Sequence, residues 1–353
     1  MTAAISVAAT PPANTPAPVL RPITVTAAPL ATTKATAAPI AASRGGPWKF
    51  SGPRDRIGLA VPFGPIDRFA WGASQPGWYL NWQVAAQPAA LPGTQFAQMV
   101  RLHEDGFRPP LEEISATARQ RPGSLWLIGN EPDVPEQDNV TPVQYATSYH
   151  TLYTALKAAD PSAQVAIGGV AQPTPLRLVY LDRILSTYRG LYGKEMPVDV
   201  WNVHAFILRE ERGSWGVGIP RGLDVDQGQL YEVADHANLE IFRGQIIAFR
   251  RWMAQRGFQG KPLIVTEYGI LMPADYGFPL ELVSQFMAAS FDFFLSATDP
   301  QLGDPADGYR LVQAFCWYSA ADKMFPTSNL FDPESGTITP LGEAYKAYIA
   351  RLK

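Results

Sequence analysis

The sequence is poor in the residue types that build disulfide frameworks, metal sites and nucleotide sites. It holds one cysteine, Cys316, in 353 residues, which excludes an intramolecular disulfide and a cysteine-ligated zinc site. Its four histidines are His103, His150, His204 and His236, and they show none of the spacings of a metal site. The serine elbow of acyl-transfer enzymes and the glycine-rich phosphate loop are also missing. We therefore expect no metal and no cofactor.

An excess of charge of one sign is missing too. The chain has 29 Lys and Arg against 32 Asp and Glu, a net charge of −3, so the basic face that a nucleic-acid-binding protein needs is not indicated. No apolar run approaches the roughly 18 residues of a membrane span. Hydrophobic residues make up 46% of the chain, which is ample for a large buried core. The composition does not indicate an oligomeric state.

Residues 1–44 differ in composition from the rest of the chain. They contain 14 Ala, 8 Thr and 7 Pro and no aromatic residue, so they bury too little apolar surface to offset the entropy of ordering. We predict a disordered linker, of a kind that tethers secreted or cell-envelope domains. The basic start and long apolar core of a signal peptide are absent. An upstream start, another export route and an intracellular location all stay open.

From residue 45 to 353, short apolar segments alternate with helical patterns. Eight strands are predicted, at residues 57–61, 78–82, 96–102, 125–129, 164–168, 198–204, 263–267 and 312–317. At about 39 residues per strand and helix, this suits an α/β fold of the (β/α)8 TIM-barrel type, as one catalytic domain with loop insertions. A doubly wound open sheet is the alternative, but its glycine-rich turn after the first strand is missing.

Two helices have clear sequence patterns. Thr141 precedes Pro142 and stands three residues before Gln144, which is the pattern of a capping box. A second apolar stripe recurs at spacings of 3 and 4 at residues 239, 242, 246, 249 and 253, which predicts a helix that covers the sheet with one face.

Two glutamates follow apolar strands directly. The strand at 125–129 runs into Asn130 and Glu131, and the strand at 263–267 ends in Glu267. A carboxylate beside a dry core costs free energy unless it is paired or its pKa shifts. One such residue is as often a structural ion pair as a functional group, but two of them at strand ends favour a catalytic pair, since barrel active sites form at the carboxyl ends of the strands.

With these residues the sequence resembles the clan A glycoside hydrolases, and loosely their β-1,3-glucanase branch. That clan ends strand four in Asn-Glu and strand seven in Glu, which Asn130, Glu131 and Glu267 match. The resemblance implies a (β/α)8 barrel and a retaining mechanism, with Glu131 as acid/base and Glu267 as nucleophile. It also implies that Asn130 contacts the 2-hydroxyl of the sugar. Retention requires carboxyl groups about 5–5.5 Å apart.

His204 ends the predicted sixth strand and is expected to orient Glu267 or the substrate. Here the sequence departs from a clan pattern, His-x-Tyr, in which the tyrosine donates to the nucleophile, because Phe206 stands at that position. Either another group donates, such as Tyr268 or a loop tyrosine, or the nucleophile is less well held. The departure keeps open a protein that binds carbohydrate without cleaving it.

Aromatic side chains at strand ends suit the apolar faces of sugars. Trp82 and Trp317 are the predicted platforms, and Asn81 is expected to contact a hydroxyl. Taken together, the sequence predicts a secreted or cell-envelope hydrolase that degrades a β-linked poly- or oligosaccharide, with β-glucan favoured. The alternative is a non-catalytic carbohydrate-binding or envelope protein on the same barrel.

Overall fold

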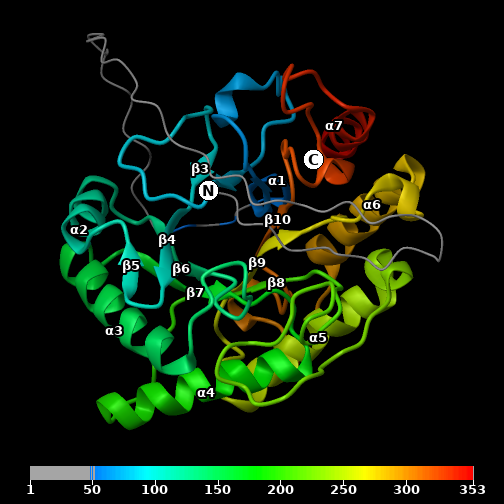
Figure 1. Ribbon diagram of the computed structural model, residues 1–353. Helices are drawn as coiled ribbons and strands as arrows, with labels where there is room; N and C mark the ends of the chain where they lie inside the picture. Colours follow the sequence, from blue (N-terminus) through cyan, green and yellow to red (C-terminus); the bar gives the residue numbers. More distant parts are fainter. Residues whose placement is uncertain (1–47, 49, 51, 353) are drawn as a thin grey trace.

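The computed structural model describes Trp48, Phe50 and residues 52–352. The predicted linker at residues 1–44 lies outside the described residues. Strands occupy the middle of the molecule and the helices α2–α7 surround them (Figure 1). The helices are α1 (Pro53–Arg56), α2 (Leu111–Gln120), α3 (Pro142–Ala159), α4 (Pro175–Tyr192), α5 (Leu239–Gln255), α6 (Leu280–Ser296) and α7 (Pro340–Arg351). Among the described residues, no helix combines the length and hydropathy that crossing a bilayer requires.

All eight predicted strands are present, with small shifts in their ends. The strands are β1 (Ile57–Ala60), β2 (Trp78–Leu80), β3 (Gln95–Phe96), β4 (Gln98–His103), β5 (Gly106–Arg108), β6 (Leu125–Asn130), β7 (Gln164–Gly169), β8 (Trp201–His204), β9 (Leu263–Tyr268) and β10 (Ala314–Trp317). The third predicted strand is divided at Ala97 into β3 and β4. An antiparallel strand, β5, was not predicted, and it pairs with the end of β4.

The strands form two sheets. One has six strands in the order β3-β2-β1-β10-β9-β8, and the other has four in the order β5-β4-β6-β7. Except for β5, the paired strands are parallel. The α/β class is therefore confirmed, with parallel strands alternating with helices.

Backbone contacts connect the two sheets at both of their junctions. Parallel bridges join Ala166 to Val200 and Val170 to Val203, between the edges β7 and β8. At the other junction, Ala97 stands between β3 and β4 and donates its N–H to the carbonyl of Tyr79. Strands β7 and β8 are thus neighbours, and the residue that leads from β3 into β4 is bonded to β2.

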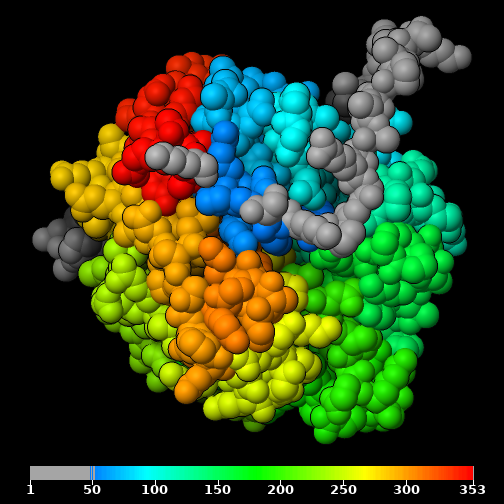
Figure 2. Space-filling view, turned by 180° about the vertical axis from the view of Figure 1, so that it is seen from behind, coloured from blue at the N-terminus to red at the C-terminus, as the bar shows by residue number. Residues whose placement is uncertain are grey.

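The first and last parts of the described chain pack together. Strand β1 pairs with β10, and the rings of Phe69 and Phe331 stack at 4.8 Å. Figure 2 shows the C-terminal segment, in red, against the first described segments of the chain, in blue. This packing brings residues that end β1 and β10 to the same rim as the ends of the middle strands.

The predicted helix patterns are confirmed. In α3, Thr141 Oγ1 accepts from the N–H of Gln144, and the N–H of Thr141 donates to Gln144 Oε1 at 2.8 Å, as a capping box requires. The predicted apolar stripe of α5 is buried at Phe242, Ile246, Phe249 and Met253, while Leu239 is half-buried. These helices pack against the strands with their apolar faces and exclude water from that face of the sheet.

Candidate active site

Three strand ends bring the candidate catalytic groups together. Glu131 follows β6, His204 is the last residue of β8, and Glu267 is the penultimate residue of β9. Because the carboxyl ends of parallel strands meet at one rim, residues 136 positions apart in the sequence become neighbours. One ligating atom from each of the three side chains lies within 4.8 Å of the others, and all three side chains are buried. The two glutamates thus face each other, as their positions at the strand ends predict.

A bulge in β9 aims Glu267 at this site. Val203 pairs with Val265, but the next residue, His204, pairs with Glu267, so β9 has one residue more than its neighbour. The extra residue is Thr266, whose hydroxyl donates to Asn202 at 2.9 Å. The register of β9 against β10 shifts at the same place. Bulges of this kind re-aim side chains beside active sites.

His204 lies between the two glutamates. Its Nδ1 is 3.0 Å from Glu131 Oε1, and its Nε2 is 3.6 Å from Glu267 Oε1. The ring fits because Gly169 has no side chain, since a Cβ there would lie 2.5 Å from Cδ2 of His204. The glycine at the end of β7 therefore provides the space for the histidine.

Burial and charge set the protonation of this group. Burial raises the pKa of Glu267 to about 7; the positive charge of His204 lowers it, and the negative charge of Glu131 raises it. Burial also opposes protonation of His204, but the charges of Glu267 and Glu131 outweigh burial, so the pKa of His204 lies above its ordinary value. The protonation of Glu267 and that of His204 therefore depend on each other.

Trp82 and Asn130 complete the surroundings of Glu267. The indole N–H of Trp82 donates to Glu267 Oε1 at 2.8 Å and reaches Asn130 Oδ1 at 3.2 Å. The amide of Asn130 donates in turn to Gln137 Oε1 at 3.2 Å, which orients its side chain. Asn81, beside Trp82, is half-buried, and its Oδ1 has no hydrogen-bond partner among the described residues.

Two side chains expected in the site lie elsewhere. Tyr268 packs at 5.1 Å from Phe294 of α6 and 5.4 Å from Phe242 of α5, on the helix-covered face of the sheet. Trp317 lies on the same face against Phe291 and donates its N–H to Ser328 O. Successive side chains of a strand point to opposite faces, so with Glu267 in the site its neighbour Tyr268 must face the helices.

The residue that sequence reasoning missed is Tyr318, directly after Trp317. Its ring lies 6.0 Å from Trp82 and 6.4 Å from Phe206, and its hydroxyl donates to Asp322. The negative charges of Glu267 and Glu131 are among the causes, after burial, that raise the pKa of Tyr318. Successive side chains of a strand point to opposite faces. If it had been known that Trp317 faces the helices, the next residue, Tyr318, would have been expected in the site.

A buried ion-pair cluster supports the loop that carries Glu131. Asp133 pairs with Arg177 Nε at 2.6 Å, and Arg177 also pairs with Glu210, all three being fully buried. Burial raises the pKa of Asp133 to about 6; the charge of Arg177 lowers it, and that of Glu131 raises it. Arg177 also donates to the carbonyl of Val217 at 2.9 Å. The cluster thus ties α4 to the loop after β6 and to the long loop after β8.

Arg101 belongs to a similar support. It donates to Asp138 at 2.6 Å, and Asp138 accepts the backbone N–H of Asn130 at 2.7 Å. Arg101 is therefore paired with a structural acid. The pair fixes the backbone immediately before Glu131.

Glu131, His204 and Glu267 are also the described residues that offer atoms for a metal ion. The two nitrogens of His204 face different carboxylates, however, so no single ring nitrogen faces both. An ion held through Nδ1 of His204 would have to replace the contact of that nitrogen with Glu131. The arrangement favours proton exchange over metal ligation.

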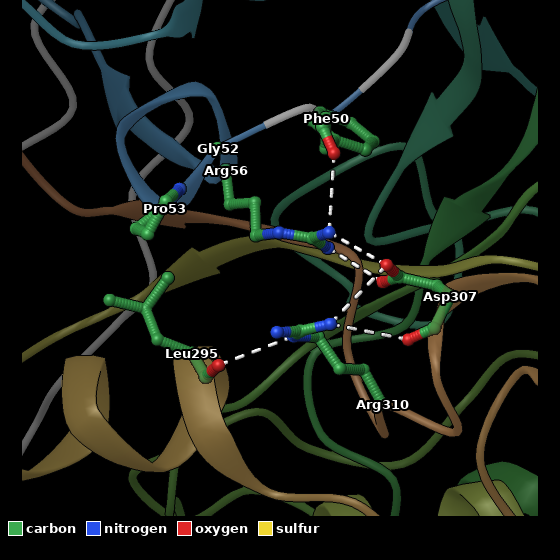
Figure 3. A pocket seen from close by; sticks show the side chains of 7 residues that line it. All are labelled: Phe50, Gly52, Pro53, Arg56, Leu295, Asp307 and Arg310. Carbon is green, nitrogen blue, oxygen red and sulfur yellow. Dashed lines mark hydrogen bonds and ion pairs between the residues drawn. The ribbon is translucent and has the colours of Figure 1, made fainter. Parts of the chain in front are cut away.

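Another cluster of charges lies at the opposite ends of the strands. A cavity of about 260 Å³ is lined there by Phe50, Gly52, Pro53, Arg56, Leu295, Asp307 and Arg310 (Figure 3). Arg56 makes two bonds of 2.7 Å to the carboxylate of Asp307, and its guanidinium also donates to Gln313 O at 2.9 Å. Because these charges pair with each other, the cluster joins the starts of β1 and β10.

Comparisons with known proteins find similarity to glycoside hydrolases. Residues 60–215 match the family model described as glycosyl hydrolase catalytic core. No curated protein matches the chain significantly. The match confirms the resemblance to glycoside hydrolases.

Solved structures of similar fold share low sequence identity with this chain. An endo-β-1,3-glucanase of GH128 subgroup II from Sorangium cellulosum is 16% identical, with a TM-score of 0.54, covering 83% of this chain and 98% of that one. A GH128 subgroup I endo-β-1,3-glucanase from Amycolatopsis mediterranei, in complex with laminarihexaose, is 18% identical, with a TM-score of 0.52, covering 83% and 99%. A curdlan-specific exo-β-1,3-glucanase from Blastomyces gilchristii is 19% identical, with a TM-score of 0.51 and the same coverage. Residues 60–215 are thus similar to a glycosyl hydrolase catalytic core, and the fold is similar to that of β-1,3-glucanases.

Proposed function

We propose that this protein is a retaining glycoside hydrolase of the clan A type that cleaves β-glucan, with β-1,3-glucan as the favoured substrate. One observation carries the proposal. Carboxyl oxygens of Glu131 and Glu267 lie within 4.8 Å of each other, with His204 between the side chains. Double displacement needs carboxyl groups about 5–5.5 Å apart, whereas inversion needs about 6.5–9.5 Å.

The proposal includes a closed (β/α)8 barrel. The bridges between β7 and β8 and the bond of Ala97 to Tyr79 support it, because they connect the two sheets at both junctions. If β3 and β4 count as one strand, the parallel strands number eight, as in this architecture. The position of all three candidate groups at the carboxyl ends of strands also fits a barrel active site.

Hydrogen bonding supports a division of roles. Glu267 accepts the N–H of Trp82, and such a bond stabilises a carboxylate. Glu131 meets Nδ1 of His204, which can donate or accept, so Glu131 can hold a proton in this position. When Glu131 is protonated and the ring proton of His204 is on Nε2, facing Glu267, the acid/base carries a proton and the nucleophile is ionised. The first chemical step requires this distribution of protons.

Two steps then balance. Glu267 attacks the anomeric carbon while the glycosidic C–O bond breaks, and Glu131 gives its proton to the leaving oxygen. Glu131 next removes a proton from water, the water oxygen bonds to the anomeric carbon, and Glu267 leaves as a carboxylate. Asn130 would hydrogen-bond the 2-hydroxyl of the sugar. A location outside the cell or in the envelope, expected from residues 1–44, suits a polymeric substrate.

The test is hydrolysis of laminarihexaose, with cellohexaose and a mannan oligosaccharide as comparisons. Glu131→Ala and Glu267→Ala should each lose about 10³-fold or more in kcat. The control is Glu112→Ala, an exposed residue of α2, which should keep full activity. With an activated aryl β-glucoside, azide should give the α-glycosyl azide with the Glu267 variant and the β-glycosyl azide with the Glu131 variant.

Other outcomes would replace the proposal. Turnover with the inverted product would rule out double displacement. Binding of laminarihexaose without turnover, kept in both glutamate variants, would establish the carbohydrate-binding protein instead.

A further inference from the structure

The contact between Trp82 and Glu267 crosses the site from a loop to a strand. Trp82 lies two residues beyond β2, and its N–H is 2.8 Å from Glu267 Oε1, 185 positions away in the sequence. An indole N–H lies in the plane of the ring, so the ring meets the carboxylate with its edge. A sugar-stacking platform would instead offer the face of the ring.

The backbone of Trp82 supports this role. Its φ of 59° lies in the left-handed region, where a bulky residue is strained and persists only if its surroundings hold it. The surroundings do so. The ring of Tyr318 packs against Trp82 at 6.0 Å, and the next residue, Gln83, accepts the N–H of Met99 in β4 at 2.9 Å. Strain of this kind clusters at functional sites.

Other candidate donors to Glu267 are absent or engaged. Phe206 has no donor group, the hydroxyl of Tyr318 is bonded to Asp322, and Tyr268 faces the helices. Nε2 of His204 lies at 3.6 Å from the carboxylate. Within residues 52–352, Trp82 is therefore the residue whose side-chain N–H bonds directly to this carboxylate.

Resting on the proposed function, we propose that Trp82 is a positioning residue for the nucleophile, which its indole N–H orients and keeps ionised. The same N–H reaches Asn130, so one donor aligns the nucleophile and the amide that faces the sugar. A charge-assisted bond to a carboxylate is stronger than a bond to a neutral ester oxygen. The bond therefore weakens when the glycosyl ester forms and strengthens again when Glu267 leaves.

The kinetic test removes the N–H and keeps the ring. Trp82→Phe, and incorporation of 3-benzothienylalanine at position 82 (which keeps the shape of tryptophan with sulfur in place of N–H), should each lower kcat about 10²-fold on laminarihexaose. KM should change less than about threefold, and the acid limb of the pH profile should move to higher pH. The control is Trp252→Phe, which removes an indole N–H bonded to Asp182 on the outer helices and should leave activity unchanged. A rise in KM at unchanged kcat would overturn the proposal and assign Trp82 to substrate stacking.

A second readout does not depend on activity. The indole 1H–15N resonance of Trp82, assigned from its loss in Trp82→Phe, should shift between pH 5 and 9 as Glu267 titrates. Glu267→Gln should abolish that shift, whereas Glu112→Gln should not. A chemical shift of the Trp82 indole that stays constant between pH 5 and 9 would overturn the inference even if the enzyme is active. A titrating resonance in a wild-type protein that cleaves none of the glycans would overturn the proposed function and limit Trp82 to a structural contact.

Discussion

Nδ1 of His204 lies 3.0 Å from Oε1 of Glu131, while the other nitrogen of the same ring faces Glu267 at 3.6 Å. One imidazole therefore connects the proposed acid/base with the proposed nucleophile. A proton that moves at one carboxylate changes the charge felt by the other through this ring.

His204→Gln should lower kcat roughly 10²-fold, because the two buried carboxylates lose the group between them. It should also move the acid limb of kcat/KM to higher pH, since the charge of His204 opposes the rise in the pKa of Glu267. The matched control is His150→Gln, at a half-buried histidine of α3 that bonds to Tyr188. An unchanged pH profile in the His204 variant would contradict the coupling.

The wild-type pH profile follows from the same site. Burial raises the pKa of Glu267 to about 7, and the nucleophile must be ionised to attack. Below about pH 7, kcat/KM should therefore fall about tenfold per pH unit. The midpoint belongs to the coupled group rather than to one residue. A rate profile that stays flat down to pH 5 would contradict a raised pKa.

Gly169→Ala should remove most activity without unfolding the protein. The added methyl would lie 2.5 Å from Cδ2 of His204 and displace the ring. Gly190→Ala is the control, because a Cβ there meets nothing within 4 Å on α4; it should keep full activity and gain about 0.5–1 kcal/mol of stability. Steady-state kinetics and thermal unfolding of both variants test this. Equal activity in the two variants would mean that the ring is not tightly held.

His236 should make stability depend on pH. Its Nδ1–H donates to Ile207 O and its Nε2 accepts the N–H of Leu271, both at 2.9 Å. Burial lowers the pKa of His236 to about 4, below its value in the unfolded chain. Its contribution is therefore complete above about pH 6.5 and is lost as the pH falls toward 4, by about 3 kcal/mol in all.

Urea unfolding at pH 7.5 and 4.5 measures this contribution. His236→Asn should reduce the difference between the two pH values by about that amount, on an otherwise lower stability. An identical difference in wild type and variant would assign the acid sensitivity to other groups.

The sequence predicts the strands, the α/β class and the neighbouring glutamates, because apolar periodicity and strand ends depend on local residue order. It does not predict which face each residue takes. Tyr268 and Trp317 were expected in the site, but the bulge at Thr266 and the alternation along β9 and β10 turn them toward the helices. A bulge depends on the pairing of neighbouring strands, and that pairing has no local sequence pattern.

The sequence also does not predict the proposed role of Trp82 in positioning Glu267. Its position after a strand indicates an aromatic near the site, but a left-handed backbone at a tryptophan has no local pattern. The packing of Tyr318 and the hydrogen bond between Gln83 and Met99 of β4, which are distant in the sequence, help to determine where the indole N–H points.

Glu131 shares the backbone conformation of Trp82, with a φ of 42°. Glycine adopts this conformation without the cost that a side chain incurs. Engineering that selects only for heat resistance would thus tend to enrich glycine at position 131, and the selected variants would be more stable but inactive. Thermostability campaigns on this scaffold need a turnover screen at every round, because one of its strained backbone positions carries its proposed proton donor.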